Sequence, residues 1–391
     1  MYVHKGNNNT DTGGINMLSP KFFIDFLRSN GIDFYAGVPD SLLKNVCAYI
    51  SDSIDSNHNI IAANEGSAIG LAAGHYLATG KPGLVYMQNS GEGNAINPLA
   101  SLTDKDVYNI PVFLLIGWRG KPGVHDEPQH KKQGKITLGI LDVMGIKYEI
   151  LSKEEDRAAQ QISRLTDYMA STGETVALVV EKDTFEPYSI QHIDNTEFPM
   201  SREEAISIVA SGIDDKDVIV STTGMISREL FEHRVAKGQN HERDFLTVGS
   251  MGHASQIALG IALEKPDRRV WCFDGDGASI MHMGGMAIIA SKLPENYIHV
   301  VFNNGAHDSV GGQPTVGLKI NLPAVAGAVG YPHTYSVDNK DALCLILSEA
   351  KNLQGPVFIE IKVRKGNRKD LGRPTTTPIQ NKEAFMAFLK K

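Results

Sequence analysis

Short apolar runs alternate with longer stretches of helical periodicity along almost the whole chain. Strands that alternate with helices in this way are typical of parallel α/β sheets. In the first half of the chain, strands are expected at 33–39, 59–64, 82–89, 110–117, 146–151 and 176–182, and helices at 19–31, 41–51, 66–80 and 153–171.

The alternation of predicted strands and helices stops after residue 182 and resumes at residue 201. Residues 183–201 are polar, contain two prolines and lack periodicity, which is typical of a linker. A second round follows, with helices expected at 201–213, 255–265, 284–293 and 342–353 and strands at 217–222, 245–250, 268–275, 297–304 and 356–363. We therefore predict an α/β protein with two domains, each a mostly parallel sheet flanked by helices. The predicted divisions are a disordered leader at 1–16, a first domain at 17–182, a linker at 183–200 and a second domain with a C-terminal extension at 201–391.

Composition and charge exclude several classes of protein. Of the 391 residues, 42% are hydrophobic, which is enough to build packed cores. The formal net charge of −7 argues against a nucleic-acid partner. Cys47, Cys272 and Cys344 are scattered without a CxxC pair, which argues against a disulfide framework and against structural zinc. The leader lacks the apolar segment of a signal peptide, and no apolar run approaches the roughly 18–20 residues of a membrane span, so we expect a soluble cytoplasmic protein.

Two acids alternate with two glycines in FDGDGASIMH, residues 273–282, directly after an apolar strand-like run. A dinucleotide fingerprint fails because Ile280 stands where the third glycine belongs. A calcium loop that starts at Asp274 fails because Gly285 stands where its final glutamate belongs. A magnesium loop, a phosphate cradle and an ordinary tight turn remain as interpretations.

The next predicted strand supplies a partner for this loop. That strand ends in the letters NNG, and the ends of neighbouring parallel strands meet at one edge of a sheet, where such sheets bind ligands. Asp276 offers a carboxylate and Asn304 an amide oxygen, which are hard ligands suited to Mg²⁺. Gly277 and Ala278 are expected to open a helix, whose N-terminal amides favour a phosphate.

GDG at 275–277 followed by NN at 303–304 resembles the diphosphate and Mg²⁺ motif of the thiamine-diphosphate (ThDP) enzymes. The resemblance implies that Asp276 and Asn304 ligate Mg²⁺ together with the backbone carbonyl of Ala306. The residues implied to border the cofactor in this motif are Gly275, Gly277, Ala278 and Asn304. Two unrelated turns between strand and helix are the alternative.

Two further stretches resemble the part of these enzymes that borders the aminopyrimidine ring of the cofactor. In VGSMGHAS, the Gly249 carbonyl is implied to accept a hydrogen bond from the 4′-amino group, and Met251 to bend the cofactor into its V shape. In STTGM, Thr223 and Gly224 are implied to border the same ring. A plain core methionine is the alternative for Met251.

A ThDP enzyme needs a carboxylic acid beside atom N1′ of the aminopyrimidine, because the cofactor does not ionise its own C2–H unaided at neutral pH. Glu65 in NEGSAIGLAAGHYLATGK is the candidate. A glutamate at the start of a helix can also simply favour the helix dipole, by about 0.3–1 kcal/mol. The stretch resembles the helix of the pyrimidine-binding domain, which implies the catalytic role. In that family this glutamate comes from one subunit and Mg²⁺ from the other, so the resemblance implies at least a homodimer with a shared site.

Most ThDP decarboxylases carry a third domain where this chain has only the linker. The two-domain layout resembles the phosphonopyruvate and sulfopyruvate decarboxylases. Three stretches, GWRGKPGVHDEPQHKKQGKITLGILDVMGI, NNGAHDSVGGQPT and LGRPTTTP, are similar to phosphonopyruvate decarboxylases. Glu92, in NSGEGNAINP, is a departure, because an apolar residue is expected there.

Phosphonopyruvate carries a carboxylate and a phosphonate, so Arg and Lys should cluster near its site. The Gly- and Pro-rich segment 118–135 is predicted to be a loop that binds this substrate, and solvated surface is the alternative. Its candidate substrate-binding residues are Arg119, Lys121, Lys131 and Lys132. Segment 364–374, RKGNRKDLGRP, is a second basic loop and is either a lid or solvated surface.

The proton donor of such a reaction has several candidates. Asp40, His125 and His130 are the candidates in the first domain, and His253 and His307 lie in loops of the second. The sequence does not distinguish among them.

Together, these patterns predict ThDP- and Mg²⁺-dependent decarboxylation of 3-phosphonopyruvate to phosphonoacetaldehyde and CO₂, in a phosphonate biosynthesis of the 2-aminoethylphosphonate type. The alternatives are a sulfopyruvate decarboxylase and a non-catalytic ThDP-binding subunit. The expected partners are a small 2-oxo acid with an anionic head group and a second copy of the chain, with no nucleic acid and no membrane.

Overall fold

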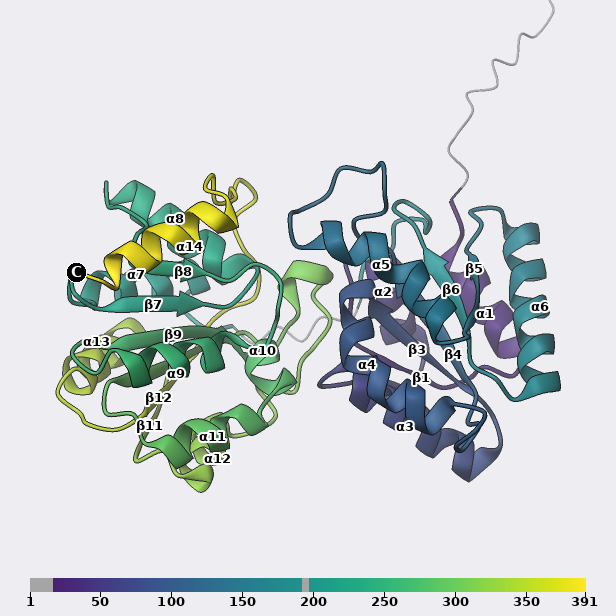
Figure 1. Ribbon diagram of the computed structural model, residues 1–391, viewed down its shortest axis with the longest axis horizontal. Coiled ribbons are helices and arrows are strands. Elements are labelled where there is room, and N and C mark those ends of the chain that lie inside the picture. Colours follow the sequence, from purple (N-terminus) through teal and green to yellow (C-terminus); the bar gives the residue numbers. More distant parts are fainter. Residues whose placement is uncertain (1–16, 192–196) are drawn as a thin grey trace, which may run out of the picture.

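The computed structural model describes residues 17–191 and 197–391. The predicted leader, 1–16, lies outside the described residues, and so does the middle of the predicted linker, 192–196. Two α/β domains lie side by side, one from each half of the chain (Figure 1). This confirms the predicted fold class.

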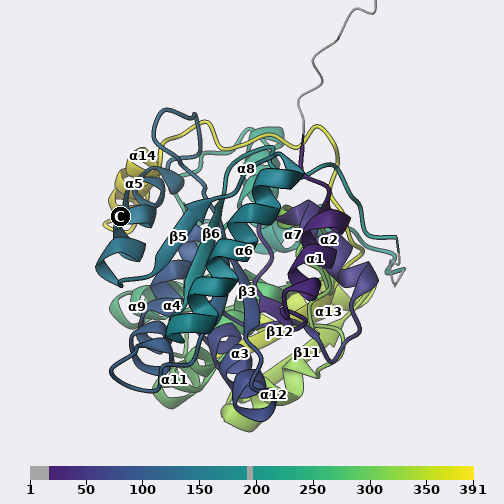
Figure 2. The same cartoon turned by 90° about the vertical axis from the view of Figure 1, so that its right-hand side faces the viewer.

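The first domain is built on a six-stranded parallel sheet. Its strands are β1 (Tyr35–Gly37), β2 (Asn59–Ile61), β3 (Gly83–Gln88), β4 (Val112–Gly117), β5 (Lys147–Ile150) and β6 (Val176–Val180), in the order β2-β1-β3-β4-β6-β5. One face packs against α1 (Pro20–Ser29), α2 (Lys44–Ser53) and α6 (Glu155–Thr172). The other face packs against α3 (Glu65–Thr79), α4 (Glu92–Pro98) and α5 (His130–Val143) (Figure 2).

The second domain repeats this architecture. Its strands are β7 (Val218–Ser221), β8 (Asp244–Leu246), β9 (Val270–Gly275), β10 (Tyr297–Asn303), β11 (His333–Val337) and β12 (Val357–Lys362), all in parallel pairs. Helices α7 (Arg202–Gly212), α8 (Met225–Ala236) and α13 (Lys340–Ala350) cover one face. Helices α9 (Ala254–Glu264), α11 (Gly284–Lys292), α12 (Leu322–Val329) and α14 (Pro378–Phe388) cover the other, and the short α10 (Asp276–Met281) follows β9.

The two sheets have the same topology. Counted within each domain, the strand order is second, first, third, fourth, sixth, fifth in both. In each sheet the order therefore reverses between the first and third strands, which are β1 and β3 in one domain and β7 and β9 in the other. Such a reversal leaves a crevice beyond the carboxyl ends of the two strands, where open α/β sheets bind ligands.

Every predicted strand and helix has a counterpart, with ends shifted by a few residues. The α-helices and strands of the described ranges that the pattern did not predict are α4, α5, α8, α12, α14 and β11. Among the described residues, no helix combines the length and the apolar character that crossing a bilayer requires.

Helix α5 corrects the prediction of a loop over 118–135. The helix begins at His130, so Lys131 and Lys132 stand in its first turn and are exposed. Its buried residues recur at helical spacing, at His130, Gly134, Thr137 and Leu141. Only one of these four is a large apolar residue, which is why hydrophobic periodicity did not indicate the helix.

Candidate active site

A cavity of about 860 Å³ lies between the two domains. Its first-domain wall comes from the loops after β1, β3 and β4 and from the starts of α3 and α5. Its second-domain wall comes from the loops after β7, β8, β9 and β10. The cavity therefore lies where the reversals of strand order in both sheets place a ligand.

The two acids of the glycine–aspartate loop have different surroundings. Asp274 is the penultimate residue of β9 and is fully buried, with its carboxylate 3.4 Å from Nε2 of His299 on β10. Asp276 opens α10 and lines the cavity, although its side chain is almost completely buried. The Thr315 hydroxyl donates a hydrogen bond to the Asp276 carboxylate. Burial raises the pKa of Asp276 to about 6, and backbone N–H groups partly oppose that shift.

The two asparagines that end β10 also differ. Asn303 donates to the Glu360 carboxylate at 2.7 Å within the sheet. Asn304 lines the cavity together with Ala306. The Asn304 amide group donates to Asp308 at 2.6 Å, and its oxygen accepts from the Ala306 N–H at 3.0 Å. The structure thus brings the three predicted magnesium ligands, Asp276, Asn304 and Ala306, to one cavity.

The segments predicted to border the aminopyrimidine ring meet in the structure. The Thr223 hydroxyl accepts a hydrogen bond from the Gly249 N–H at 3.0 Å, which joins the loop after β7 to the loop after β8. Gly224 caps α8 with a φ of 101°, a conformation that favours glycine. Thr223, Gly224, Gly249 and Met251 all line the cavity, as do Gly275, Gly277 and Ala278 after β9.

Glu65 is the first residue of α3 and lines the cavity from the first domain. Its side chain is buried and accepts a hydrogen bond from the Asn94 amide at 2.7 Å. Gly91 lies so close that a Cβ there would stand 2.3 Å from Glu65 Oε1. The preceding residue, Asn64, caps α3 and donates to the Met281 carbonyl of the second domain at 3.2 Å. The acid is therefore held in place at the boundary between the domains.

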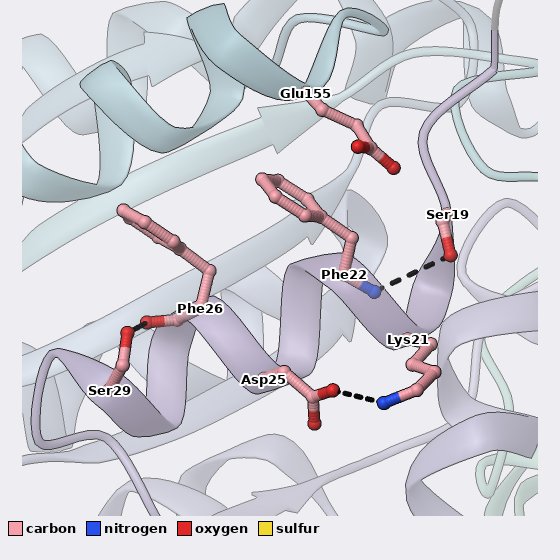
Figure 3. Close-up of a pocket in the computed structure, with 7 residues that line it drawn as sticks. All are labelled: Ser19, Lys21, Phe22, Asp25, Phe26, Ser29 and Glu155. Atoms are coloured by element: carbon pink, nitrogen blue, oxygen red, sulfur yellow. Dashed lines mark hydrogen bonds and ion pairs between the residues drawn. The ribbon is translucent and has the colours of Figure 1, made fainter.

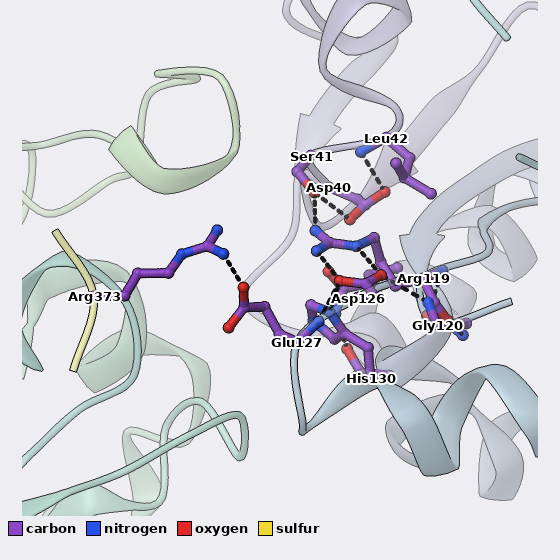
Figure 4. A network of polar contacts seen from close by, with 12 residues as sticks. Asp40, Ser41, Leu42, Arg119, Gly120, Asp126, Glu127, His130 and Arg373 are labelled. Carbon is purple, nitrogen blue, oxygen red and sulfur yellow. Dashed lines mark hydrogen bonds and ion pairs between the residues drawn. The ribbon is translucent and has the colours of Figure 1, made fainter. Parts of the chain in front are cut away.

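Arg119 and His130 reach the cavity as part of a charged network (Figure 4). The Arg119 guanidinium donates to the Asp126 carboxylate, with Nε at 2.8 Å from Oδ2, and to the Ser41 hydroxyl at 2.6 Å. Asp126 also lies 2.8 Å from Nδ1 of His130. Burial would raise the pKa of Asp126, but the hydrogen bonds from Arg119 and His130 outweigh it and hold that pKa well below its usual range. The planar fork of Arg119 is therefore already occupied by a carboxylate.

Asp40 lies behind this wall rather than on it. It is fully buried, accepts a hydrogen bond from the Leu42 N–H at 2.9 Å, and does not line the cavity. Burial raises its pKa to about 6, while the Leu42 N–H and the Arg119 charge oppose the shift.

The remaining basic candidates do not line the cavity. Lys121 forms an ion pair with Glu181, and Lys131, Lys132 and His125 are exposed. The C-terminal basic loop sends one residue to the cavity, Arg373, whose ion pair with Glu127 joins the two domains.

Several residues of the cavity were missed by the sequence patterns or left without a role. Asn94 donates a hydrogen bond to Glu65, and Asp308 accepts one from Asn304. Arg228, on α8, also lines the cavity. His253 and His307 line the second-domain side, and burial lowers the pKa of His307 to about 4. The motifs identify loops that line the cavity, but a side chain contributed by the body of a helix, such as Arg228, carries no motif of its own.

A second hollow lies on the surface of the first domain beside α1 (Figure 3). Its walls include Phe22, Phe26 and Glu155, and its one ion pair, Lys21 with Asp25, lies within α1 itself. None of the predicted site residues lines it, so the chemistry is concentrated in the cavity between the domains.

The fold and the cavity define an α/β protein whose candidate site is built from equivalent loops of two similar domains. Residues 20–141 match the family described as thiamine pyrophosphate enzyme, N-terminal TPP binding domain. Residues 222–361 match the corresponding C-terminal TPP binding domain. The chain belongs to the thiamine pyrophosphate enzymes, and thiamine pyrophosphate is another name for ThDP.

Three relatives narrow the type of enzyme. The chain is 31% identical to phosphonopyruvate decarboxylase of Streptomyces hygroscopicus, over 95% of this chain and 94% of that protein. It is 32% identical to phosphonopyruvate decarboxylase of Streptomyces viridochromogenes, over 93% of both chains. It is 29% identical to sulfopyruvate decarboxylase of Methanosarcina acetivorans, over 88% of this chain and 91% of that one. The protein is therefore a carboxy-lyase, a ThDP-dependent decarboxylase of the phosphonopyruvate and sulfopyruvate type.

Proposed function

We propose that the protein decarboxylates 3-phosphonopyruvate to phosphonoacetaldehyde and CO₂, with ThDP and Mg²⁺ as cofactors, in a phosphonate biosynthesis of the 2-aminoethylphosphonate type. The observation that carries the proposal is the meeting of Glu65 and Asp276, one from each domain, at a single cavity. The two phosphonopyruvate decarboxylases named above support the choice of substrate, because the likeness to them is greater and longer than that to the sulfopyruvate enzyme.

The donor set at Asp276 fits Mg²⁺. Asp276 is a buried carboxylate that has no ion pair with Lys, Arg or His in the described parts of the chain. An unpaired buried carboxylate is costly, and a divalent cation removes that cost. Asn304 and the Ala306 carbonyl add neutral oxygens, and Mg²⁺ fills its remaining positions with water and phosphate oxygens. We propose these three residues as its protein ligands.

The rest of the cavity fits ThDP, which supplies an electron sink for the carbon that loses CO₂. The Glu65 carboxyl would share a hydrogen bond with N1′ of the aminopyrimidine, and the Gly249 carbonyl would accept from the 4′-amino group. Met251 would support the bend of the cofactor, beside Thr223 and Gly224. The remaining contacts to the cofactor would come from Gly275, Gly277, Ala278 and Asn304.

The product carbon must receive one proton after CO₂ leaves. Of the three predicted first-domain donors, His130 lines the cavity, and Asp126 orients its ring through Nδ1. Asp40 is buried behind Ser41, and His125 is exposed. We propose His130 as the donor, because it alone of the three faces the space that a substrate can enter.

The assembly that we propose is a homodimer whose sites are shared between subunits, in a cytoplasmic enzyme. Within one chain, residues of both domains line the same cavity. Shared sites require the same two domain surfaces to pair between chains, and a symmetric homodimer supplies two such pairs. The proposal of a shared site is tested separately below.

Release of CO₂ from three 2-oxo acids tests the substrate. With ThDP and Mg²⁺ present, phosphonopyruvate should be turned over with the highest kcat/KM, sulfopyruvate less well and pyruvate least. Omission of ThDP, or removal of Mg²⁺ by a chelator, should abolish the activity. A preference for sulfopyruvate would instead make the protein a sulfopyruvate decarboxylase, and no activity on any of the three would favour a non-catalytic ThDP-binding subunit.

A further inference from the structure

Four arginines line the cavity, and three of them are already paired with acids. Arg119 forms a hydrogen-bonded ion pair with Asp126. Arg202 on α7 forms a two-point ion pair with Glu229 and a further contact with Asp308. Arg373 pairs with Glu127. The fourth, Arg228, has no hydrogen bond and no ion pair within residues 17–191 and 197–391.

The position of Arg228 is fixed by its neighbours on α8. The preceding residue, Ser227, donates to the Thr222 carbonyl at 2.7 Å, and the following residue, Glu229, is held by Arg202 at 2.8 Å. Both neighbours are buried, whereas Arg228 is half-buried and lines the cavity, as does Met225 one turn earlier. The helix thus presents a guanidinium to the cavity from a rigid support.

Burial without a partner is unfavourable for a cation. Burial lowers the pKa of Arg228, whereas partner carboxylates raise the pKa of Arg119 and Arg202. Arg228 nevertheless stays protonated at neutral pH, because arginine loses its proton only at far higher pH. A half-buried charge that faces a cavity is stabilised when an anion enters that cavity.

We propose that Arg228 binds the anionic head group of the substrate and so selects 2-oxo acids that carry a phosphonate or a sulfonate. This inference rests on the proposed function and names the residue that sets its specificity. The predicted candidates fit this task less well, because Lys121, Lys131 and Lys132 do not line the cavity and Asp126 occupies the fork of Arg119. The guanidinium fork of Arg228 can hold two phosphonate oxygens at once.

The diphosphate of the cofactor is a second anion of the same chemistry. Its site is expected on the other loops of the second domain, at Gly277, Ala278 and the Mg²⁺ ligands Asp276 and Asn304. Those loops follow β9 and β10, whereas Arg228 stands in the second turn of α8, after β7. The experiment must nevertheless separate the two anions.

Steady-state kinetics of Arg228→Gln on phosphonopyruvate and on pyruvate provides the test. Pyruvate has a methyl group in place of the anion. The kcat/KM for phosphonopyruvate should fall about 10- to 150-fold, which corresponds to one lost charge-assisted hydrogen bond of about 1.5–3 kcal/mol. The kcat/KM for pyruvate should scarcely change. Arg228→Lys should recover part of the loss, since it restores the charge without the fork.

Two controls accompany this variant. Lys237→Gln removes a positive charge from the exposed far end of the same helix and should leave both substrates unaffected. The affinity for ThDP in the presence of Mg²⁺, measured by titration calorimetry, should be the same for Arg228→Gln and the wild type. A fall in ThDP affinity equal to the fall in kcat/KM would assign Arg228 to the diphosphate and overturn the proposal.

Other outcomes also overturn it. An equal loss for both substrates would place Arg228 in the shared chemistry, and no loss would remove it from substrate binding. The variant Lys131→Ala/Lys132→Ala provides a comparison. If it lowered the ratio of kcat/KM for phosphonopyruvate to that for pyruvate and Arg228→Gln did not, the head group would be bound by residues of α5. If the wild type decarboxylated none of the 2-oxo acids, the proposed function would fail by itself. Calorimetry with methylphosphonate on the ThDP-loaded protein would then still decide the proposal, because Arg228→Gln should lose the binding that the wild type shows.

Discussion

Glu65 stands where a carboxylate has two different effects. As the first residue of α3 it favours the helix dipole, and as a lining residue of the cavity it faces the predicted site of the aminopyrimidine ring. The dipole contribution is about 0.3–1 kcal/mol and needs no particular partner. The hydrogen bond from Asn94 and the close approach of Gly91 fix the side chain far more narrowly than a dipole effect requires.

Substitution separates these two effects. Glu65→Gln should retain ThDP and lose turnover by about 10²- to 10⁴-fold, the range for a lost acid–base group. Glu155→Gln is the matched control, because Glu155 is the exposed first residue of α6. It should lose a few tenths of a kcal/mol of stability and no activity. Near wild-type kcat in Glu65→Gln, measured at saturating ThDP, would remove Glu65 from the mechanism.

Glu92 shows what happens when an acid occupies an apolar position. It is buried on α4, and neither carboxylate oxygen has a hydrogen-bond partner within the part of the chain that the structure describes. Burial raises its pKa to about 8, and the nearby Thr137 hydroxyl acts in the opposite direction. The group is therefore largely neutral at pH 7, and it adds no full negative charge near the site.

This raised pKa makes a prediction about stability. Between about pH 4.5 and 8 the unfolded Glu92 releases its proton while the folded one keeps it, so rising pH favours unfolding across that window. Glu92→Met should remove this dependence. Its stability relative to the wild type should grow with a slope of at most about 1.4 kcal/mol per pH unit, and level off above pH 8. Urea unfolding at pH 5.5, 7 and 8.5 measures the slope. If the free energy of unfolding changed with pH in the same way for both proteins, Glu92 would be charged when folded.

At the scale of elements, the buried Arg202–Glu229 pair fixes α8 against α7. Both side chains are almost fully buried, and Nε and Nη2 of Arg202 donate to the two oxygens of Glu229 at 2.8 and 2.9 Å. Arg202 also donates a hydrogen bond to the Asp308 carboxylate, which accepts another from the Asn304 amide group. One ion pair therefore links the support of Arg228 to a predicted magnesium ligand.

A single and a double substitution test the structural role of the Arg202–Glu229 pair. Arg202→Met should destabilise the fold by about 3–5 kcal/mol, because it leaves Glu229 charged and unpaired in the interior. Arg202→Met/Glu229→Leu should recover much of this loss, since neither buried charge remains. Arg157→Met is the control, because Arg157 pairs with Glu154 at the surface and should cost no more than about 1 kcal/mol. Equal losses in Arg202→Met and Arg157→Met, by urea unfolding, would contradict the structural role of the pair.

The elements also show where sequence patterns suffice. Apart from β11, the strands were predictable because a parallel strand buried on both faces is a short, nearly continuous apolar run. β11 was missed because its residues, HTYSV, are largely polar and mostly half-buried. Helix α5 was not predictable, because glycine, threonine and histidine occupy most of its buried positions. The loops that line the cavity were predictable because each motif places several lining residues in one short segment. The partners of the basic residues were not predictable, because the sequence does not show whether an arginine such as Arg119 forms an ion pair with an acid such as Asp126.

At the scale of the whole molecule, two domains of equal topology face each other across one cavity. Three helices with apolar sequences leave large hydrophobic side chains exposed in a single chain. These side chains are Leu77 on α3, Leu263 on α9 and Ile288 on α11. Single exposed apolar side chains are normal on a protein surface, whereas a contiguous apolar patch marks an interface. The homodimer therefore stays a prediction, and so does the question of which two domains form each site.

Complementation between two inactive variants decides whether the sites are shared. Glu65→Gln inactivates the first-domain half of a site, and Asp276→Ala inactivates the second-domain half. If each site combines domains of different subunits, a mixed dimer contains one site with both lesions and one intact site. Random exchange of equal amounts makes half of the dimers mixed, so about a quarter of the wild-type activity should return. If both halves come from one chain, every site keeps one lesion, and mixing restores nothing. Differently tagged subunits, purified through both tags after co-expression, isolate the mixed dimer. Its CO₂ release should then be about half that of the wild type, and activity no higher than that of either variant alone would place the complete site within one chain.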